Sequence, residues 1–408
     1  MRLNDISKRI IIFIGLLTVS NIVFSQGHWS GKLHRSDGNN IAFNFEWKTE
    51  KGKPVWYIYN AAEKIKVDNI SKEGDSLFIQ MPVFESQFRV IQSGKKITGV
   101  WVKRGSVKTQ VIPFSAEPGS KRFTATAGAD KNISGRWAVL FANSKTNEQS
   151  VGEFKQAGNK LTGTFLNATG DYRYLEGIVS KDSLFLSGFD GGHAFLFTAR
   201  IDDNKKISGG TYFSGASYKE DWSAVKDPTA KVPQESVAMY VKPGEENLHF
   251  TFKDLEGKKV SIQDERFKNK VVVIQLMGSW CPNCMDETAF LSDYYNKNKQ
   301  RGVEVIALAY EYSTDWERSI KSLKKFQDRY HVKYTVLNTE VTVNDSLRTE
   351  KTLPELTAIK FFPSSVILDK KGKVRKLDTG FNGPGTGVHY DVYKSEFEET
   401  INNLLGEN

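Results

Sequence analysis

The feature that most constrains this fold is the position of the only two cysteines among the 408 residues, Cys281 and Cys284. They follow a continuous apolar run, residues 271–277, which is typical of a central strand buried on both faces. A helical pattern then continues to about residue 299. A count of two cysteines excludes a disulfide-stapled scaffold and any all-cysteine zinc or iron–sulfur site. The order of elements predicts a mixed α/β sheet with helices on both faces after about residue 237.

The Cys-x-x-Cys spacing at this strand-to-helix junction predicts a redox-active dithiol. At a helix N-terminus, the first-turn N–H groups and the helix dipole stabilise a thiolate at Cys281. Cys284 lies one turn further on, where it can attack the sulfur of Cys281 and resolve a mixed disulfide. Pro282 fits the first helical turn, since the N–H group that it lacks would have no intrahelical partner there. The alternatives are a zinc site, for which no second Cys/His pair has suitable spacing, and an inert structural disulfide, which would constrain the unfolded chain little.

A carboxylate follows the cysteine pair at helical spacing. Glu287 comes three residues after Cys284, so both side chains are expected on one face of the helix. A carboxylate there can relay a proton to or from the resolving thiol, or tune the acidity of the pair. The alternative is an exposed charge on the helix surface. We therefore predict Cys281, Cys284 and Glu287 as the catalytic residues.

These segments resemble a known family. Residues 270–276, followed by Gly-Ser-Trp-Cys-Pro-Asn-Cys at 278–284, are similar to the TlpA/ResA-like thiol–disulfide oxidoreductases of the thioredoxin superfamily. The resemblance extends over about residues 248–405, and residues 254–261 look like the family's initial hairpin. It implies a thioredoxin-like fold, disulfide-bearing protein substrates, a membrane thiol electron donor, and no cofactor beyond the Cys281–Cys284 dithiol/disulfide.

The resemblance also implies a substrate-binding surface. Phe362 and Pro363 match the superfamily's cis-proline, which would lie against the cysteines and bind an extended substrate segment through backbone hydrogen bonds. Trp280 is expected to shield the thiols, with core packing as the alternative. The sequence departs from the family pattern at Thr288, where a proline often follows the active-site glutamate, and at Ser364, where threonine often follows the cis-proline. The predicted substrate-binding residues are Trp280, Pro282, Phe362, Pro363 and Ser364.

The N-terminal half shows a different pattern, with short alternating segments such as residues 41–47 and 55–59. Turn signals recur about every ten residues, as is typical of antiparallel meanders, sandwiches and barrels. Three segments repeat in the same order at offsets of about 104 to 110 residues, which favours a duplication over coincidence. The matched pairs are residues 30–33 with 134–137, 75–79 with 182–186, and 95–99 with 205–209.

We therefore predict a multidomain chain, in which two tandem all-β antiparallel modules of meander- or barrel-like fold precede the thioredoxin-like domain. The predicted boundaries are 27–131 and 132–226 for the β modules, 227–236 for a polar linker with two prolines, and 237–408 for the C-terminal domain. The tryptophans of the modules are expected to be core or rim residues. The alternative is that they line a binding barrel for an unknown ligand.

The N-terminus has the pattern of a secretory signal. Arg2, Lys8 and Arg9 form a basic segment, and residues 10–24 form an apolar segment that is shorter than the roughly 20 residues of a spanning helix. We predict a cleaved signal peptide at residues 1–25 and a periplasmic or otherwise extracytoplasmic location, where disulfides persist. The alternative is an uncleaved membrane anchor through residues 10–24.

The predicted function is that of an exported oxidoreductase that reduces protein disulfides by dithiol exchange through Cys281 and Cys284. The alternative is a ligand- or partner-binding protein, whose β modules carry the main function and whose redox domain is an accessory. A peroxidase is disfavoured, because it needs a peroxidatic cysteine in a Pro/Thr-rich loop. The net charge of +9 is spread along the chain without a nucleic-acid-binding motif, so we expect no nucleic acid partner.

Overall fold

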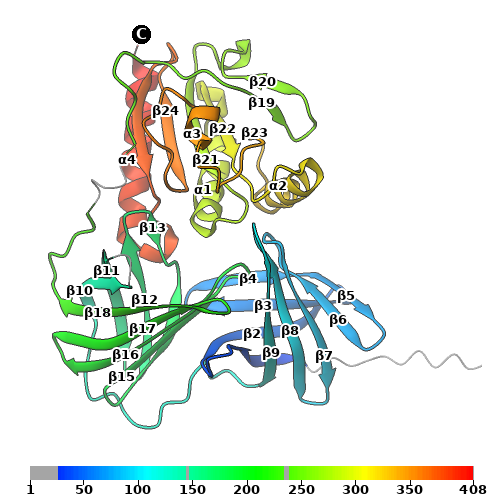
Figure 1. Ribbon diagram of the computed structural model, residues 1–408, viewed down its shortest axis with the longest axis vertical. Helices are drawn as coiled ribbons and strands as arrows, with labels where there is room; N and C mark the ends of the chain where they lie inside the picture. Colours follow the sequence, from blue (N-terminus) through cyan, green and yellow to red (C-terminus); the bar gives the residue numbers. More distant parts are fainter. Residues whose placement is uncertain (1–25, 144–146, 234–238, 408) are drawn as a thin grey trace, which may run out of the picture.

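The structure is a computed structural model that describes residues 26–143, 147–233 and 239–407 (Figure 1). The predicted signal segment, residues 1–25, lies outside the described residues. In the described part of the chain, no helix is both long and apolar enough to cross a membrane. Figure 1 shows two β modules side by side, with the C-terminal domain above both of them.

The first module is a 9-stranded antiparallel sheet with the strand order β4-β3-β2-β1-β9-β8-β7-β6-β5. Its strands are β1 (Gly27–His34), β2 (Asn40–Glu50), β3 (Lys53–Asn60), β4 (Glu63–Val67), β5 (Asn69–Glu73), β6 (Ser76–Gln80), β7 (Ser86–Ser93), β8 (Lys96–Arg104) and β9 (Thr109–Pro118). The predicted alternation is confirmed in β2, where Ile41, Phe43, Phe45 and Trp47 are buried. Because side chains alternate across a strand, these residues all lie on the side of the sheet that encloses the core.

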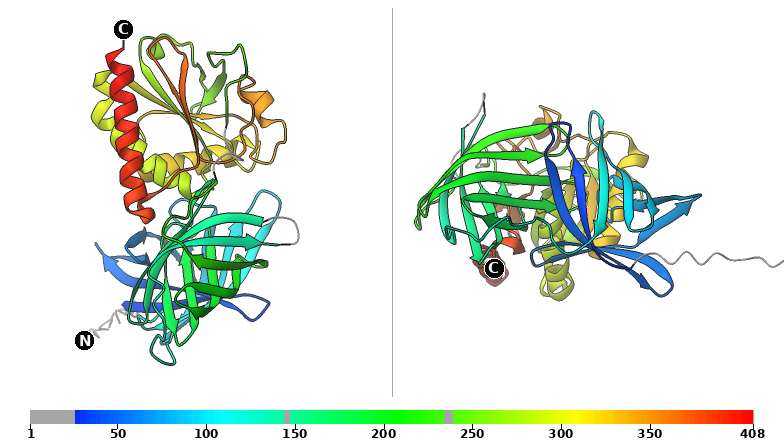
Figure 2. Two further views of the ribbon diagram at one scale, coloured as in Figure 1. Left: turned by 90° about the vertical axis from the view of Figure 1, so that its left-hand side faces the viewer. Right: turned by 90° about the horizontal axis from the view of Figure 1, so that it is seen from below.

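The second module is also 9-stranded, and it closes into a barrel because β11 pairs with both β10 and β12. Its strands are β10 (Gly135–Ala142), β11 (Asn147–Ala157), β12 (Lys160–Asn167), β13 (Gly170–Asp171), β14 (Leu175–Ser180), β15 (Ser183–Phe189), β16 (Ala194–Asp203), β17 (Lys206–Ser214) and β18 (Tyr218–Lys226). The short β13 pairs with β12 at the end of the strand order, outside the closed ring. The curvature of both modules is visible in Figure 2.

The internal repeat falls on equivalent strands of the two modules. Residues 30–33 lie in β1 and residues 134–137 lead into β10, and each of these strands pairs with the last strand of its module. The other matched pairs fall on β6 and β15 and on β8 and β17. The predicted fold class is confirmed. The tryptophans of both modules are buried in the cores, as expected for packing: Trp29, Trp47, Trp56, Trp101, Trp137 and Trp222.

The C-terminal domain is built on a 7-stranded mixed sheet with the strand order β20-β19-β23-β22-β21-β24-β25. Its strands are β19 (Thr251–Asp254), β20 (Lys259–Ser261), β21 (Val271–Met277), β22 (Val303–Ala309), β23 (Thr335–Asn338), β24 (Ser364–Leu368) and β25 (Val374–Thr379). Its helices are α1 (Pro282–Asn298), α2 (Trp316–Tyr330), α3 (Arg348–Thr352) and α4 (Val388–Gly406), with short 3-10 turns η1 (Glu265–Phe267), η2 (Lys299–Arg301) and η3 (Pro384–Thr386). β21 pairs in parallel with β22 and antiparallel with β24.

Both faces of this sheet are covered, which explains the continuous apolar run of β21. Val271 and Val273 join a cluster that includes residues of α1, α2 and α4. Val272 and Ile274 join a second cluster on the opposite face, which includes residues just before β19 and just after α3. A strand that is buried on both faces does not alternate between apolar and polar residues, so β21 is a nearly continuous apolar run.

Both modules contact the C-terminal domain. Glu85 of the first module forms an ion pair with Arg318 of α2, with an N–O distance of 3.0 Å. Glu153 of the second module lies 3.0 Å from the Nε2 atom of His389 in α4. The left view of Figure 2 shows the C-terminal domain above the two modules.

Candidate active site

Cys281 and Cys284 form a disulfide at the N-terminus of α1. Cys281 is the N-cap residue with an extended backbone, and Pro282 is the first helical residue. The backbone N–H of Cys284 donates to the sulfur of Cys281 at 3.2 Å. First-turn N–H groups lack intrahelical partners, so this geometry directs them at the sulfur that would carry the charge after reduction.

Most of the predicted substrate-binding residues surround Cys281. The Phe362–Pro363 peptide bond is cis, and the carbonyl oxygen of Phe362 lies 3.5 Å from the sulfur of Cys281. Trp280 donates its ring N–H to a backbone carbonyl just after β22 at 2.8 Å, and its ring centroid lies 5.8 Å from that of Phe362. Ser364 donates its hydroxyl to the backbone carbonyl of Phe361 at 2.9 Å, so it stabilises the turn that contains the cis-proline.

Glu287 is buried, with 1% of its surface exposed, which contradicts the alternative of an exposed helix charge. Its carboxylate accepts hydrogen bonds from Gln275 at 2.8 Å, from Ser365 at 2.7 Å and from Tyr393 at 3.4 Å. Burial raises the pKa of Glu287 to about 7, although all three hydrogen bonds oppose the shift. A carboxyl group that titrates near neutral pH can both accept and donate a proton there.

Sequence reasoning missed the groups that hold this carboxyl. Gln275 carried a readable signal, because it is a polar residue inside the apolar run of β21 and a buried amide needs a hydrogen-bond partner. Ser365 and Tyr393 carried none, since only the folded sheet and α4 bring them to α1. Glu311, the second residue after β22, was also missed. It accepts hydrogen bonds from the N–H and hydroxyl groups of Ser279 at 2.8 and 2.6 Å, and burial raises its pKa to about 7.

We expect Glu287→Gln to change the pH dependence of stability. The folded protein holds the Glu287 proton up to about pH 7, whereas the unfolded chain releases it near 4.5. The free energy of unfolding of the wild type should therefore fall as the pH rises through this window, by up to about 3 kcal/mol. Glu287→Gln should lose this contribution and fall less over the same range, apart from a pH-independent offset from altered hydrogen bonds, while Glu311 still contributes a fall of the same sign. Urea unfolding at pH 5 and pH 8 measures this difference in the free energy of unfolding. The control is Asp293→Asn, which changes an exposed carboxylate of the same helix. The same change between pH 5 and pH 8 in Glu287→Gln and in the wild type would contradict the prediction.

Loops of both β modules lie against the cysteine loop. Cys281 is only 3% exposed, and Asn283, between the two cysteines, is also buried. From the second module, Gly170 of β13 is so close that a Cβ atom there would overlap the side-chain amide of Asn283. From the first module, Val83 and Phe84 share a hydrophobic cluster with both cysteines. The modules therefore restrict access to the disulfide in this arrangement.

A buried arginine connects the three units at this place. Arg173, between β13 and β14, donates to the carboxylate of Asp286 in α1 through its Nε and Nη2 atoms, at 2.8 and 2.9 Å. It also donates to Glu63 of the first module at 2.6 Å. Asp190 of the second module lies 3.6 Å away. Asp286 directly precedes Glu287, so this ion-pair network joins both modules to the helix that carries the cysteines.

The contact at Gly170 gives a testable prediction. Gly170→Ala should push β13 away from Asn283, both because of the overlap and because the φ of +142° disfavours a side chain. We expect the Cys281–Cys284 disulfide to become more accessible, so that a phosphine reductant reduces it faster than in wild type. Gly158→Ala is the matched control, since Gly158 has a positive φ in the same module but no atom within 4 Å of the position that a Cβ atom would take. Equal reduction rates in both variants would contradict the contact.

The fold and this site together define a class of protein. A central sheet, a Cys-x-x-Cys disulfide at the N-terminus of its first long helix and a facing cis-proline are the features of a thioredoxin-fold protein with a dithiol/disulfide couple. The predicted thioredoxin-like fold is confirmed for the C-terminal domain.

The family model and the sequence relatives agree with this class. The Redoxin family model matches residues 242–392. The thiol-disulfide oxidoreductase ResA of Bacillus thuringiensis subsp. konkukian (strain 97-27) is 33% identical over 131 residues, which are 32% of this chain and 66% of the relative. The chloroplastic peroxiredoxin Q of Sedum lineare is 30% identical over 155 residues, which are 38% of this chain and 77% of the relative. A solved thiol:disulfide interchange protein of the thioredoxin family from Chlorobium tepidum TLS aligns with a TM-score of 0.30 and 17% identity, covering 41% of this chain and 100% of that one.

The chain belongs to the TlpA/ResA-like proteins of the thioredoxin superfamily, through its C-terminal domain. It spans about two thirds of the length of the ResA relatives, 66% in the case above.

Proposed function

We propose that this protein is an exported thiol–disulfide oxidoreductase, which reduces disulfides of client proteins through Cys281 and Cys284. The observation that carries the proposal is the disulfide at the N-terminus of α1, with Cys281 at the N-cap and beside the cis Phe362–Pro363 peptide. The ResA relatives are named thiol-disulfide oxidoreductases, which supports the same activity here.

In the proposed cycle, two electrons first convert the Cys281–Cys284 disulfide into a dithiol. The thiolate of Cys281 attacks one sulfur of a client disulfide, the client S–S bond breaks, and one client cysteine leaves as a thiolate. The thiolate of Cys284 then attacks the sulfur of Cys281, releases the second client thiolate and restores the Cys281–Cys284 disulfide. We propose a membrane thiol electron carrier as the dithiol donor that reduces the couple again.

Two groups of residues support these steps in the proposal. Cys284 has to lose its proton before it attacks, and we assign Glu287 as the acceptor because its carboxyl titrates near neutral pH. Trp280, Phe362 and the neighbouring residues Pro282, Pro363 and Ser364 would bind an extended client segment beside the sulfur of Cys281. The backbone groups next to the cis-proline would supply hydrogen bonds that do not depend on the client's side chains.

The location and the domain boundaries are parts of the same proposal. The mature chain would begin near Gln26, outside the cytoplasm, with the β modules at residues 27–131 and 132–226, the linker at 227–236 and the redox domain after it. Determining the N-terminus of the protein purified from its native membrane and soluble fractions tests the export step. A start near Gln26 is expected, whereas a retained Met1 in the membrane fraction would favour the anchor at residues 10–24.

Reduction of insulin by the full mature chain tests the activity. With dithiothreitol as the electron source, the chain should accelerate precipitation of the insulin B chain well above the rate with dithiothreitol alone. The same samples with hydrogen peroxide in place of insulin should show no acceleration of dithiothreitol oxidation. Turnover with peroxide but not with insulin would instead favour the chemistry of the peroxiredoxin relative.

A further inference from the structure

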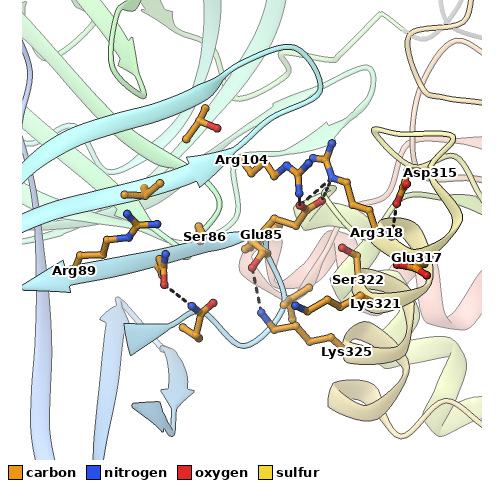
Figure 3. Close-up of a pocket in the computed structure, with 16 residues that line it drawn as sticks. Glu85, Ser86, Arg89, Arg104, Asp315, Glu317, Arg318, Lys321, Ser322 and Lys325 are labelled. Atoms are coloured by element: carbon orange, nitrogen blue, oxygen red, sulfur yellow. Dashed lines mark hydrogen bonds and ion pairs between the residues drawn. The ribbon is translucent and has the colours of Figure 1, made fainter. Parts of the chain in front are cut away.

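A cleft lies between the first β module and the C-terminal domain (Figure 3). Strands β7 and β8 contribute one wall, and α2 contributes the other. Val83 and Phe84 add apolar surface between them. Its volume of about 530 Å³ is within the range of established ligand sites.

Five of the side chains that line the cleft are basic, and they come from both domains. They are Arg89, Arg104, Arg318, Lys321 and Lys325. Its three carboxylates are Glu85, Asp315 and Glu317. Glu85 already pairs with Arg318 at 3.0 Å, and Asp315 accepts the backbone N–H of Arg318 at 2.7 Å as the N-cap of α2. The lining therefore keeps an excess of positive charge.

Lys321 and Lys325 of α2 differ from Arg104 and Arg318, which both pair with Glu85. Lys325 is partly buried and donates to the carbonyl oxygen of Phe84 at 3.2 Å. Burial lowers its pKa to about 8; the charge of Glu85 opposes this shift, and the charge of Lys321 adds to it. Among the described residues, neither lysine has a carboxylate within ion-pair distance. A negatively charged ligand would relieve this repulsion and restore the full charge of Lys325.

The cleft adjoins the redox site. Val83 and Phe84 line the cleft and also belong to the hydrophobic cluster of Cys281 and Cys284. Tyr312 lies within the electrostatic influence of Glu85 and Arg318, and its ring stacks on Trp280 with a centroid distance of 5.2 Å. A ligand in the cleft would thus contact the loop that helps to cover the disulfide.

We propose that this cleft binds an extended acidic segment of the client protein, next to the disulfide that is reduced; this inference rests on the proposed function. Figure 3 shows Arg89 toward one end of the cleft and Lys321 and Lys325 toward the other, with Glu85 between them. A peptide with separated negative charges can contact the basic side chains at both ends of the cleft. A single small anion would contact those at one end only. Charge complementarity of this kind selects partners and accelerates their association.

Binding of a cysteine-free peptide tests the proposal on the full mature chain. The probe is a fluorescein-labelled peptide with four glutamates spaced by small polar residues, compared with the same peptide carrying glutamines. Fluorescence anisotropy should show at least about tenfold tighter binding of the acidic peptide, and its affinity should fall with added salt. Lys321→Glu should weaken the acidic peptide about tenfold. Lys324→Glu makes the same charge change at an exposed residue of α2 outside the cleft, and it should bind like wild type.

Several results would overturn this assignment. One is equal affinity for the acidic and the glutamine peptide, and another is an equal loss of peptide affinity in Lys321→Glu and Lys324→Glu. A third is displacement of the acidic peptide by free citrate at the concentration at which the peptide itself binds, since a small anion would then bind as well as the peptide. The probe lacks a disulfide, so Cys281→Ser should bind it like wild type. If the chain reduces insulin but does not bind the acidic peptide, the assignment of the cleft as a binding site is wrong and the proposed function stands. If it binds the acidic peptide but reduces no disulfide, the proposed function is wrong.

Discussion

Cys281→Ser is expected to abolish the reduction of insulin by the full chain, leaving only the background rate of the added dithiothreitol. The reason is that Cys281 occupies the N-cap of α1 beside the cis-proline, where the first-turn N–H groups stabilise the thiolate that would attack the client disulfide. A serine hydroxyl does not ionise near neutral pH and forms no stable bond with a client cysteine. Insulin precipitation and mass spectrometry of the products measure the effect.

Cys284→Ser is the matched variant, because it keeps the nucleophile and removes only the resolving thiol. It should also lose turnover, but it should accumulate a mixed disulfide between Cys281 and the client, visible on a non-reducing gel and released by excess reductant. Full activity of Cys281→Ser, or trapping through Cys284 in that variant, would contradict the assigned order of the two cysteines.

Arg173→Met is expected to have the second large effect, on the docking of the three units. It leaves the carboxylates of Asp286, Glu63 and Asp190 close together and largely buried, without the cation that compensates them. Removing one partner of a buried ion pair typically costs about 3–5 kcal/mol. We expect the first unfolding transition to occur at a lower urea concentration. We also expect the Cys281–Cys284 disulfide to be reduced faster, because the modules are no longer docked against α1.

The control for Arg173→Met is Arg200→Met, which removes an arginine whose ion pair with Asp202 lies at the surface of the same module. Exposed pairs of this kind contribute no more than about 1 kcal/mol, so this variant should unfold and react like wild type. If Arg173→Met matched Arg200→Met in both urea unfolding and disulfide reduction, the network would have no role in holding the modules over the cysteines.

The C-terminal fold was predictable because its signals are local. The apolar run of β21, the Cys-x-x-Cys after it and the helical pattern of α1 are contiguous, and each follows from the burial or geometry of a few neighbouring residues. The β modules were predictable for a similar reason, since alternation in β2 reports a sheet with one buried face. The repeat could be detected in the sequence because its matched segments form equivalent strands of the two sheets.

The surroundings of Glu287 and Arg173 were not predictable in this way. Ser365 and Tyr393 reach Glu287 only because β24 pairs with β21 and α4 packs beside α1. Arg173 is one of many arginines in the sequence, and nothing in its neighbours distinguishes it from Arg200. Its difference lies in burial, which no short pattern encodes when the partners come from three separate units.

The sequence by itself determined the class of the two halves, the position of the cysteines at a strand-to-helix junction and the candidate chemistry of that pair. These features depend on interactions between residues close in the chain. The tertiary structure alone decided that Glu287 is buried with a pKa near 7, that both β modules lie against the cysteine loop, and that a basic cleft opens beside it. Those properties depend on which distant surfaces exclude water from one another, and desolvation is a property of the packed chain rather than of any segment.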